Sequence, residues 1–251
     1  MSSSGHLVLA REMLGLEAAT TPSFEVVVHL GTLLSIMVVM RRPVLAVARA
    51  LPLLGKPRCW ISSYAANEGF RHLVLGLLAT LPTVFVALVF KDAVDNLFAR
   101  PILAASMLLV TAGIVLSTRW SPQAGAAGRI NWRTALLMGV AQALATTPGI
   151  SRSGSTIAAG MWRGAERKEV GAFSFLMAIP AIVGAAVLHG RDIVRLEESR
   201  VVLAWGFATS FAVGFIALTF LLKLLRHGRL WIFTPYLLLV GGGGVLFFII
   251  S

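Results

Sequence analysis

The sequence predicts an all-α fold: a polytopic integral membrane protein with six transmembrane helices, re-entrant helical hairpins and an inverted-topology repeat. Hydrophobic residues make up 57% of the 251 positions and charged residues only 13%, so that several windows reach the roughly 20 apolar residues that cross a bilayer. A Ser/Gly-rich motif occurs twice, once at the start of the chain and once inside apolar sequence, which predicts the hairpins and the repeat. We expect a single membrane domain over 1–251, with one repeat in about 1–118 and the other in about 132–251.

Six stretches are long and apolar enough to be transmembrane helices. They are 24–40, 72–90, 101–118, 170–189, 201–222 and 230–250. The stretch 132–147 is too short to cross, because Pro148 interrupts it. With 153–162 it predicts a hairpin that enters the membrane and returns. Irregular backbone at that depth is tolerated only where it is buried in protein or lines a cavity.

The basic residues, which give the chain a net charge of +11, set its predicted orientation. They gather between the spans, where the positive-inside rule places them in the cytoplasm. The stretches concerned are 41–71, 119–133, 163–169 and 223–229, while the N-terminal segment, 91–100, 191–200 and the C-terminus face outward. Because the charge is spread over several loops, it does not predict a nucleic-acid-binding face. The single cysteine, Cys59, excludes an internal disulfide.

The stretch 147–156, Thr-Pro-Gly-Ile-Ser-Arg-Ser-Gly-Ser-Thr, places an arginine and several hydroxyls inside apolar sequence. Pro148 forbids a smooth helix, and Gly149 and Gly154 permit unusual dihedrals and close backbone approach. We therefore expect a break between two half-helices. The second half-helix is expected to begin in 153–156, where hydroxyl side chains favour a helix N-terminus.

Arg152 makes this break a candidate anion site. The free N–H groups and positive dipole end of the second half-helix attract negative charge, and the guanidinium fork matches a pair of phosphate oxygens. The simpler alternative is a proline-kinked helix whose arginine reaches the membrane surface. Apolar sequence on both sides favours the functional interpretation, since a charge buried in a membrane is usually functional.

A second Ser/Gly motif, Ser-Ser-Ser-Gly-His at 2–6, opens the chain. Gly5 precedes Phe24 by 19 positions, and Gly154 precedes Phe173 by the same 19. Three predicted crossings lie between the two copies, so the second copy would be inverted relative to the first. The alternative is a coincidence between two Ser/Gly-rich loops.

If the repeat is real, two hairpin tips enter from opposite leaflets and their polar loops meet. The meeting groups would be Ser2, Ser3, Ser4 and His6 from the first loop and Ser151, Arg152, Ser153 and Thr156 from the second. Such a set suits a phosphate, because the arginine binds oxygens while a serine or the histidine attacks phosphorus or moves a proton.

Four segments carry a resemblance to a known family: Ser-Ser-Ser-Gly-His-Leu at 2–7, Phe-Glu-Val-Val-Val-His-Leu-Gly at 24–31, Pro-Gly-Ile-Ser-Arg-Ser-Gly-Ser-Thr at 148–156 and Phe-Ser-Phe-Leu-Met-Ala-Ile-Pro at 173–180. They resemble the bacterial undecaprenyl-diphosphate phosphatases of the BacA/UppP family. The resemblance implies hydrolysis of undecaprenyl diphosphate to the monophosphate carrier of peptidoglycan synthesis, and resistance to bacitracin. It also implies a divalent cation (Mg²⁺ or Ca²⁺) and an inner-membrane location with a periplasmic active site. A homodimer is compatible with the resemblance.

Carried over by motif, the resemblance implies roles for individual residues. Ser3 is the candidate nucleophile, His6 is its rival as nucleophile or acts as general base, and Arg152 holds the diphosphate. Glu25 is a secondary site candidate. The substrate-binding candidates are Ser2, Ser4, Gly149, Ser151, Ser153, Gly154 and Thr156.

The sequence departs from the family pattern before the Ser-Ser-Ser-Gly-His motif. There the family has an apolar helix that carries two glutamates spaced Glu-x-x-x-Glu and ends in Pro-Val. This sequence has Met1 where that valine would stand, and Glu12 and Glu17 lie in the following segment and do not replace the pair. The metal ligands are therefore unknown. We hypothesise a misassigned start codon, since valine can be encoded by GTG. The chain as printed is expected to insert but to hydrolyse poorly, and an upstream extension to restore cation-dependent activity.

Two other functions fit the same features. A lipid or anion transporter also uses inverted repeats and half-helix anion sites, but it needs access from both sides of the membrane. A non-catalytic membrane-embedded binding subunit fits if the glutamate helix is truly absent. Phosphate release by detergent-solubilised protein distinguishes a phosphatase from both alternatives.

Overall fold

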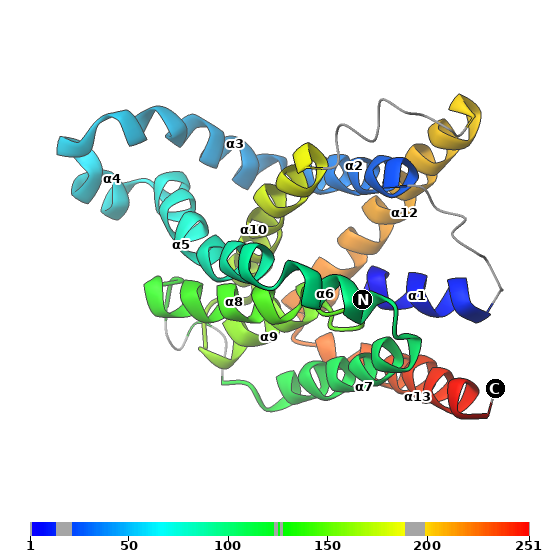
Figure 1. Cartoon of the computed structure of the whole chain (residues 1–251). Helices are drawn as coiled ribbons and strands as arrows, with labels where there is room; N and C mark the ends of the chain where they lie inside the picture. The colour runs from blue at the N-terminus through cyan, green and yellow to red at the C-terminus, as the bar shows by residue number, and fades with distance from the viewer. Residues whose placement is uncertain (1, 14–21, 123–124, 126–127, 189–198, 251) are drawn as a thin grey trace. The chain divides into compact units, whose positions relative to one another are not determined.

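The computed structural model describes residues 2–13, 22–122, 125, 128–188 and 199–250, and every element in these ranges is a helix (Figure 1). The predicted all-α class is therefore confirmed. The α-helices are α1 (Ser3–Met13), α2 (Pro22–Val39), α3 (Arg41–Ala50), α4 (Trp60–Ala66), α5 (Glu68–Val89), α6 (Lys91–Phe98), α7 (Pro101–Ser117), α8 (Trp132–Leu144), α9 (Arg152–Trp162), α10 (Arg167–Leu188), α12 (Arg200–Arg226) and α13 (Thr234–Ile250). The short 3₁₀ helices are η1 (Leu51–Gly55), η2 (Pro57–Cys59), η3 (Thr118–Trp120) and η4 (Leu230–Phe233).

Within the described residues, four helical stretches are long and apolar enough to cross a membrane: Glu68–Val89, Pro101–Trp120, Arg200–Arg226 and Leu230–Ile250. The chain is therefore a multi-pass membrane protein. A fifth span arises if Val27–Val39 and Arg41–Gly55 are counted together, although they are bent by 88° at their junction. The predicted span at 170–189 lies largely in α10. A total of six spans stays a prediction.

The stretch 41–71, predicted as a cytoplasmic loop, is largely helical. It contains α3, η1, η2 and α4, followed by the start of α5. Arg41, Arg42 and Arg49 lie on α3 and are exposed, whereas Ala50 at its end is fully buried. A short helix with basic residues on one face and apolar residues on the other is typical of a segment that lies along a membrane surface.

The chain forms two compact units, and each takes segments that are distant in the sequence. Unit 1 comprises Met1–Glu17, Leu78–Ser174 and Leu224–Ser251, and unit 2 comprises Ala18–Leu77 and Phe175–Lys223. Three long helices, α5, α10 and α12, contribute to both units. The predicted repeat boundaries near 118 and 132 stay predictions.

Unit 1 is built on α7, which packs against α13, α1 and α9; α7 and α13 lie side by side in Figure 1. Two glycines of α13 make this packing close. A Cβ atom added to Gly241 would lie 2.9 Å from Leu109 Cδ2 on α7, and one added to Gly244 would lie 2.6 Å from Leu9 Cδ2 on α1. Small residues allow helices in membranes to approach in this way.

The predicted helical hairpin is present in unit 1 as α8 and α9, which pack against each other. The side chain of Asn131 caps α8 by accepting a hydrogen bond of 3.0 Å from Thr134 N. A Cβ added to Gly160 on α9 would lie 3.2 Å from Met138 Sδ on α8. That this hairpin enters the membrane stays a prediction.

Unit 2 contains a second close helix pair, between α2 and α12. A Cβ atom on Gly214 would lie 2.7 Å from Ser35 Oγ, and one on Gly206 would lie 2.8 Å from Phe24 Cε2. A Cβ atom on Gly31 would overlap the Ser210 hydroxyl. Glycines on both helices thus bring their backbones together.

Candidate active site

Helix α9 begins at the predicted anion-binding motif, and Ser151 caps it. Ser151 has φ −74° and ψ 113°, and its Oγ accepts a hydrogen bond of 3.2 Å from Gly154 N. A serine cap satisfies one of the free N–H groups at a helix N-terminus. Arg152 is consequently the first residue of the helix, and the predicted start in 153–156 was too late.

The turn before α9 requires the glycine at position 149. Gly149 has φ +94°, and an added Cβ atom would overlap the Ala104 carbonyl oxygen and lie 2.7 Å from Met107 Cβ. A side chain is therefore excluded both by the dihedral angle and by the neighbouring helix. The predicted break, with its unusual dihedral and close backbone approach, is confirmed.

Thr111 on α7 fixes this turn, although nothing in the sequence marked it. Its hydroxyl donates to Gly149 O at 2.8 Å and accepts from Ser151 N at 3.0 Å. The side chain is fully buried. Hydroxyls inside spans usually bond to their own helix, as Ser106 does with Ile102 O, so residue type alone was a weak signal.

Arg152 is partly exposed, and among the described residues its guanidinium makes no hydrogen bond or ion pair. Only its backbone carbonyl is used, accepting a hydrogen bond of 2.8 Å from Thr156 Oγ1. A charge with no protein partner at a helix N-terminus is available to an anion. Ser153, the next residue, is also partly exposed.

The hydroxyls later in the motif, those of Ser155 and Thr156, are buried. Thr156 is fully buried, and its Oγ1 lies 2.6 Å from Ser174 Oγ in the third turn of α10. Ser155 Oγ is buried without a hydrogen-bond partner among the described residues, and Gly154 is buried against Ser151 and Val115. Substrate contacts of Thr156 and Gly154 stay predictions.

The first Ser/Gly motif was expected to be a loop, but it is helical from Ser3 onward. Ser3 is exposed, Ser4 and His6 are partly exposed, and all three lie in the first two turns of α1. Ser2, just before the helix, has φ 49°, which is uncommon for a residue with a side chain. Its hydroxyl oxygen is buried and has no hydrogen-bond partner among the described residues.

The first motif lies against the turn of the second, while the inverted repeat itself stays a prediction. A Cβ atom on Gly5 would lie 2.8 Å from Gly149 Cα and 3.0 Å from Ser2 Oγ. The first turn of α1 therefore lies against the turn that precedes α9 and its first residue, Arg152. Backbone N–H groups at a helix N-terminus are not used within their own helix and attract anions.

His6 is held at both ring nitrogens. Its Nδ1 lies 2.8 Å from Ser2 O, and its Nε2 lies 2.7 Å from the hydroxyl of Tyr236 on α13. The two rings are parallel within 5°, with centroids 5.6 Å apart. Sequence reasoning missed Tyr236, which lies 230 positions away inside a predicted span.

A divalent cation does not fit the described residues of this site. These residues supply hydroxyls, one imidazole and one guanidinium, but no carboxylate, which is the oxygen ligand that Mg²⁺ and Ca²⁺ prefer. Over all the described ranges, no three His, Cys, Asp or Glu side chains gather to hold a metal. Glu25 lies in α2, and its side chain is outside the described residues.

Comparison with known proteins gives a consistent result. A family model described as "Bacitracin resistance protein BacA" matches residues 1–243. The chain is 37% identical over 247 residues to an undecaprenyl-diphosphatase of Desulforapulum autotrophicum, covering 96% of this chain and 89% of the relative. It is 40% identical over 236 residues to the undecaprenyl-diphosphatase of Rhodopirellula baltica, covering 92% of this chain and 84% of the relative. The match of the family model to nearly the whole length shows that the chain belongs to the BacA family.

Proposed function

We propose that this protein is an undecaprenyl-diphosphate phosphatase, which hydrolyses its substrate to undecaprenyl phosphate and phosphate and so recycles the lipid carrier for peptidoglycan synthesis. The observation that carries the proposal is the contact of Gly5 with Gly149, which places the first turn of α1 against the turn that leads into Arg152 at the N-terminus of α9. Such a place suits a diphosphate in an otherwise apolar protein. The relatives, which are named undecaprenyl-diphosphatases, support the same reaction.

The geometry supports Ser3 as nucleophile and His6 as general base. The two residues are three positions apart on α1, so their side chains share one helix face. Both ring nitrogens of His6 are in hydrogen bonds, whereas Ser3 is exposed. Attack by Ser3 Oγ on the terminal phosphorus would break the bridging P–O bond and release undecaprenyl phosphate, with the serine proton passing to His6. Water would then cleave the phosphoserine, and the serine would recover the proton.

Arg152 supplies the electrostatic part of this mechanism. Its planar fork can hold two oxygens of the phosphoryl group while negative charge develops on them. The N–H groups of the first turn of α9 add donors that need no reorganisation. The divalent cation remains part of the proposal through the family resemblance alone, and no step above uses it.

The function is tested by phosphate release from undecaprenyl diphosphate. The purified chain of 251 residues and a form extended through the upstream reading frame are assayed in detergent, with and without chelator. Phosphate release by either form supports the phosphatase, and loss with chelator that Mg²⁺ or Ca²⁺ restores supports the cation. Movement of the lipid across vesicles without phosphate release would show a transporter. Binding of undecaprenyl diphosphate without phosphate release and without movement of the lipid would show a binding subunit.

The inner-membrane location and the periplasmic active site are also proposals, and Cys59 tests the orientation. Cys59 is exposed at the end of η2, in the basic stretch 41–71. It should resist membrane-impermeant maleimide in intact cells and react after permeabilisation. The matched control is Asn96→Cys in a Cys59→Ser background, since Asn96 is exposed on the stretch 91–100 that should face outward. Labelling of Cys59 in intact cells would overturn the orientation.

A further inference from the structure

Tyr236 is the seventh residue of the apolar span Leu230–Ile250. A phenolic hydroxyl inside such a span costs free energy unless it finds a partner, since lipid offers none. The partner here is His6 Nε2, at 2.7 Å. The contact therefore joins the first helix of the chain to the last, within unit 1.

The hydrogen bonds fix the tautomer of the neutral His6 ring. The Ser2 carbonyl can only accept, so the Nδ1 atom at 2.8 Å carries the hydrogen. In the neutral ring, Nε2 is then the atom with the lone pair, and the Tyr236 hydroxyl donates to it. Nε2 is thereby the nitrogen that can take a proton during the reaction.

The same two bonds fix the ring in space. They attach to opposite ends of the imidazole, and the Tyr236 ring lies parallel to it within 5°. Rotation of His6 about its Cβ–Cγ bond would break both bonds. A general base held in this way loses less freedom on reaching the geometry of proton transfer.

We propose that Tyr236 is a positioning residue for His6, which holds the ring with Nε2 in the basic form that the Ser2 carbonyl selects and moves aside only as the serine proton reaches Nε2. This inference rests on the proposed function, because it assigns a role in the same reaction. Tyr236 keeps its own proton throughout. The proton that His6 takes up comes from the nucleophile.

The test compares Tyr236→Phe, which removes the hydroxyl and keeps the ring, with Tyr64→Phe. Tyr64, the only other tyrosine of the chain, lies on α4 in unit 2 and provides the matched control. Tyr236→Phe is expected to lower kcat about tenfold, which is the effect of losing roughly one hydrogen bond, with little change in KM. Tyr64→Phe is expected to leave both constants unchanged. An unchanged kcat in Tyr236→Phe, at equal melting temperature, would overturn the proposal.

A second readout does not depend on hydrolysis. Diethyl pyrocarbonate acylates the free lone pair of a neutral imidazole, and its reaction at His6 can be followed by peptide mass, with exposed His227 as internal reference. Loss of the Tyr236 hydroxyl should speed acylation of His6 severalfold and leave His227 unchanged. An unchanged rate at His6 would overturn the contact itself. The acylation test can be read even if the protein releases no phosphate. Absence of phosphate release would contradict the proposed function, but not the contact between Tyr236 and His6.

A double-mutant cycle separates positioning from a general structural role. If Tyr236 acts through His6, adding Tyr236→Phe to His6→Ala should cause no further loss of kcat. A further tenfold loss in the double variant would mean that the tyrosine acts independently of His6, and would overturn the assignment.

Discussion

Replacement of Arg152 by lysine is expected to lower phosphate release from undecaprenyl diphosphate by about a hundredfold to a thousandfold. Lysine keeps the charge but loses the two-pronged contact with phosphoryl oxygens. A transition-state contact of this kind is worth about 2.7–4 kcal/mol. The loss should come from the substrate contact itself, because among the described residues the guanidinium makes no hydrogen bond or ion pair that the substitution would disturb. The variant should therefore fold as the parent protein does.

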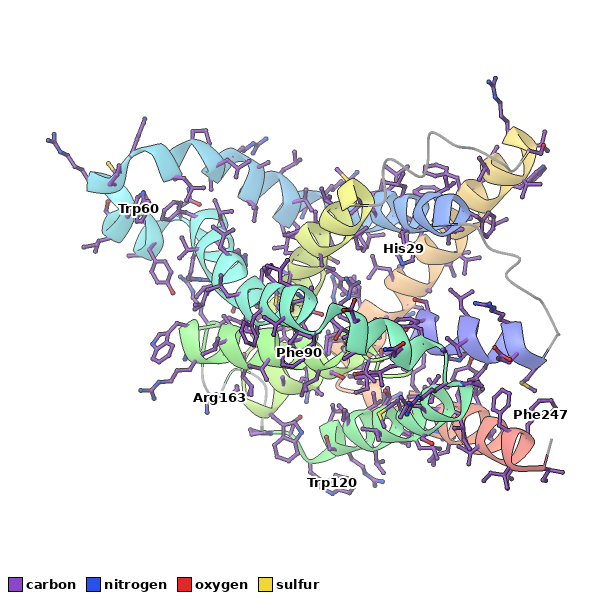
Figure 2. All side chains as sticks on the ribbon, in the orientation of Figure 1. His29, Trp60, Phe90, Trp120, Arg163 and Phe247 are labelled. Carbon is purple, nitrogen blue, oxygen red and sulfur yellow. The ribbon has the colours of Figure 1, made fainter. Side chains whose placement is uncertain are left out.

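The matched control is Arg163→Lys, at the other end of the same helix. Arg163 follows α9 as its C-terminal cap and is exposed; Figure 2 labels it. Hydrolysis by this variant should stay within a factor of about two, as is usual for exposed positions with small free-energy effects. Near-normal turnover by Arg152→Lys would instead mean that Arg152 is structural, as in the proline-kinked alternative.

Replacement of Gly149 by alanine should damage the fold of the site itself. The φ of +94° alone costs an alanine about 1–2 kcal/mol. The added methyl group would also overlap the backbone oxygen of Ala104, which cannot move away by changing a rotamer. We expect a lower melting temperature in detergent and the loss of hydrolysis, because both the turn before α9 and the contact with Gly5 must shift.

Gly113→Ala provides the matched control for that substitution. Gly113 lies on α7 like Ala104, but a Cβ atom added there would have no neighbour within 4 Å. Alanine is the better helix former by about 1 kcal/mol, so this variant should be as stable as the parent or slightly more so. A Gly149→Ala protein that melts and hydrolyses like Gly113→Ala would contradict the described turn.

The features predicted from sequence are those with local causes. Pro148 and Gly149 allow only a few backbone conformations, so the break before Arg152 could be predicted from residue type. The equal spacing of Gly5 and Gly154 from their following phenylalanines predicted an inverted repeat whose Ser/Gly motifs would meet. Gly5 does lie against Gly149, while the repeat itself stays a prediction. The loop expected at the first motif was wrong, because serines that favour helix N-termini also serve as the first helical residues.

The features that could not be predicted depend on contacts between distant helices. Thr111 and Tyr236 stand in apolar spans, where a single hydroxyl usually bonds to its own helix or a neighbour without further role. Their partners, the Gly149 turn and His6, are chosen by helix packing, which residue order does not specify. The bend of 88° between Val27–Val39 and Arg41–Gly55 was missed for a different reason, since hydropathy measures apolar length but not direction.

The hydroxyl of Thr111 also bears on whether the candidate anion-binding motif could be transferred to another protein. Its two hydrogen bonds, to Gly149 O and from Ser151 N, come from a separate spanning helix. A designer who moves the ten residues 147–156 into another membrane scaffold would transfer the arginine, the glycines and the helix cap, but not the group that shapes the turn. The smallest transferable unit is therefore the motif together with the segment of α7 that carries Thr111 and faces it through Ala104.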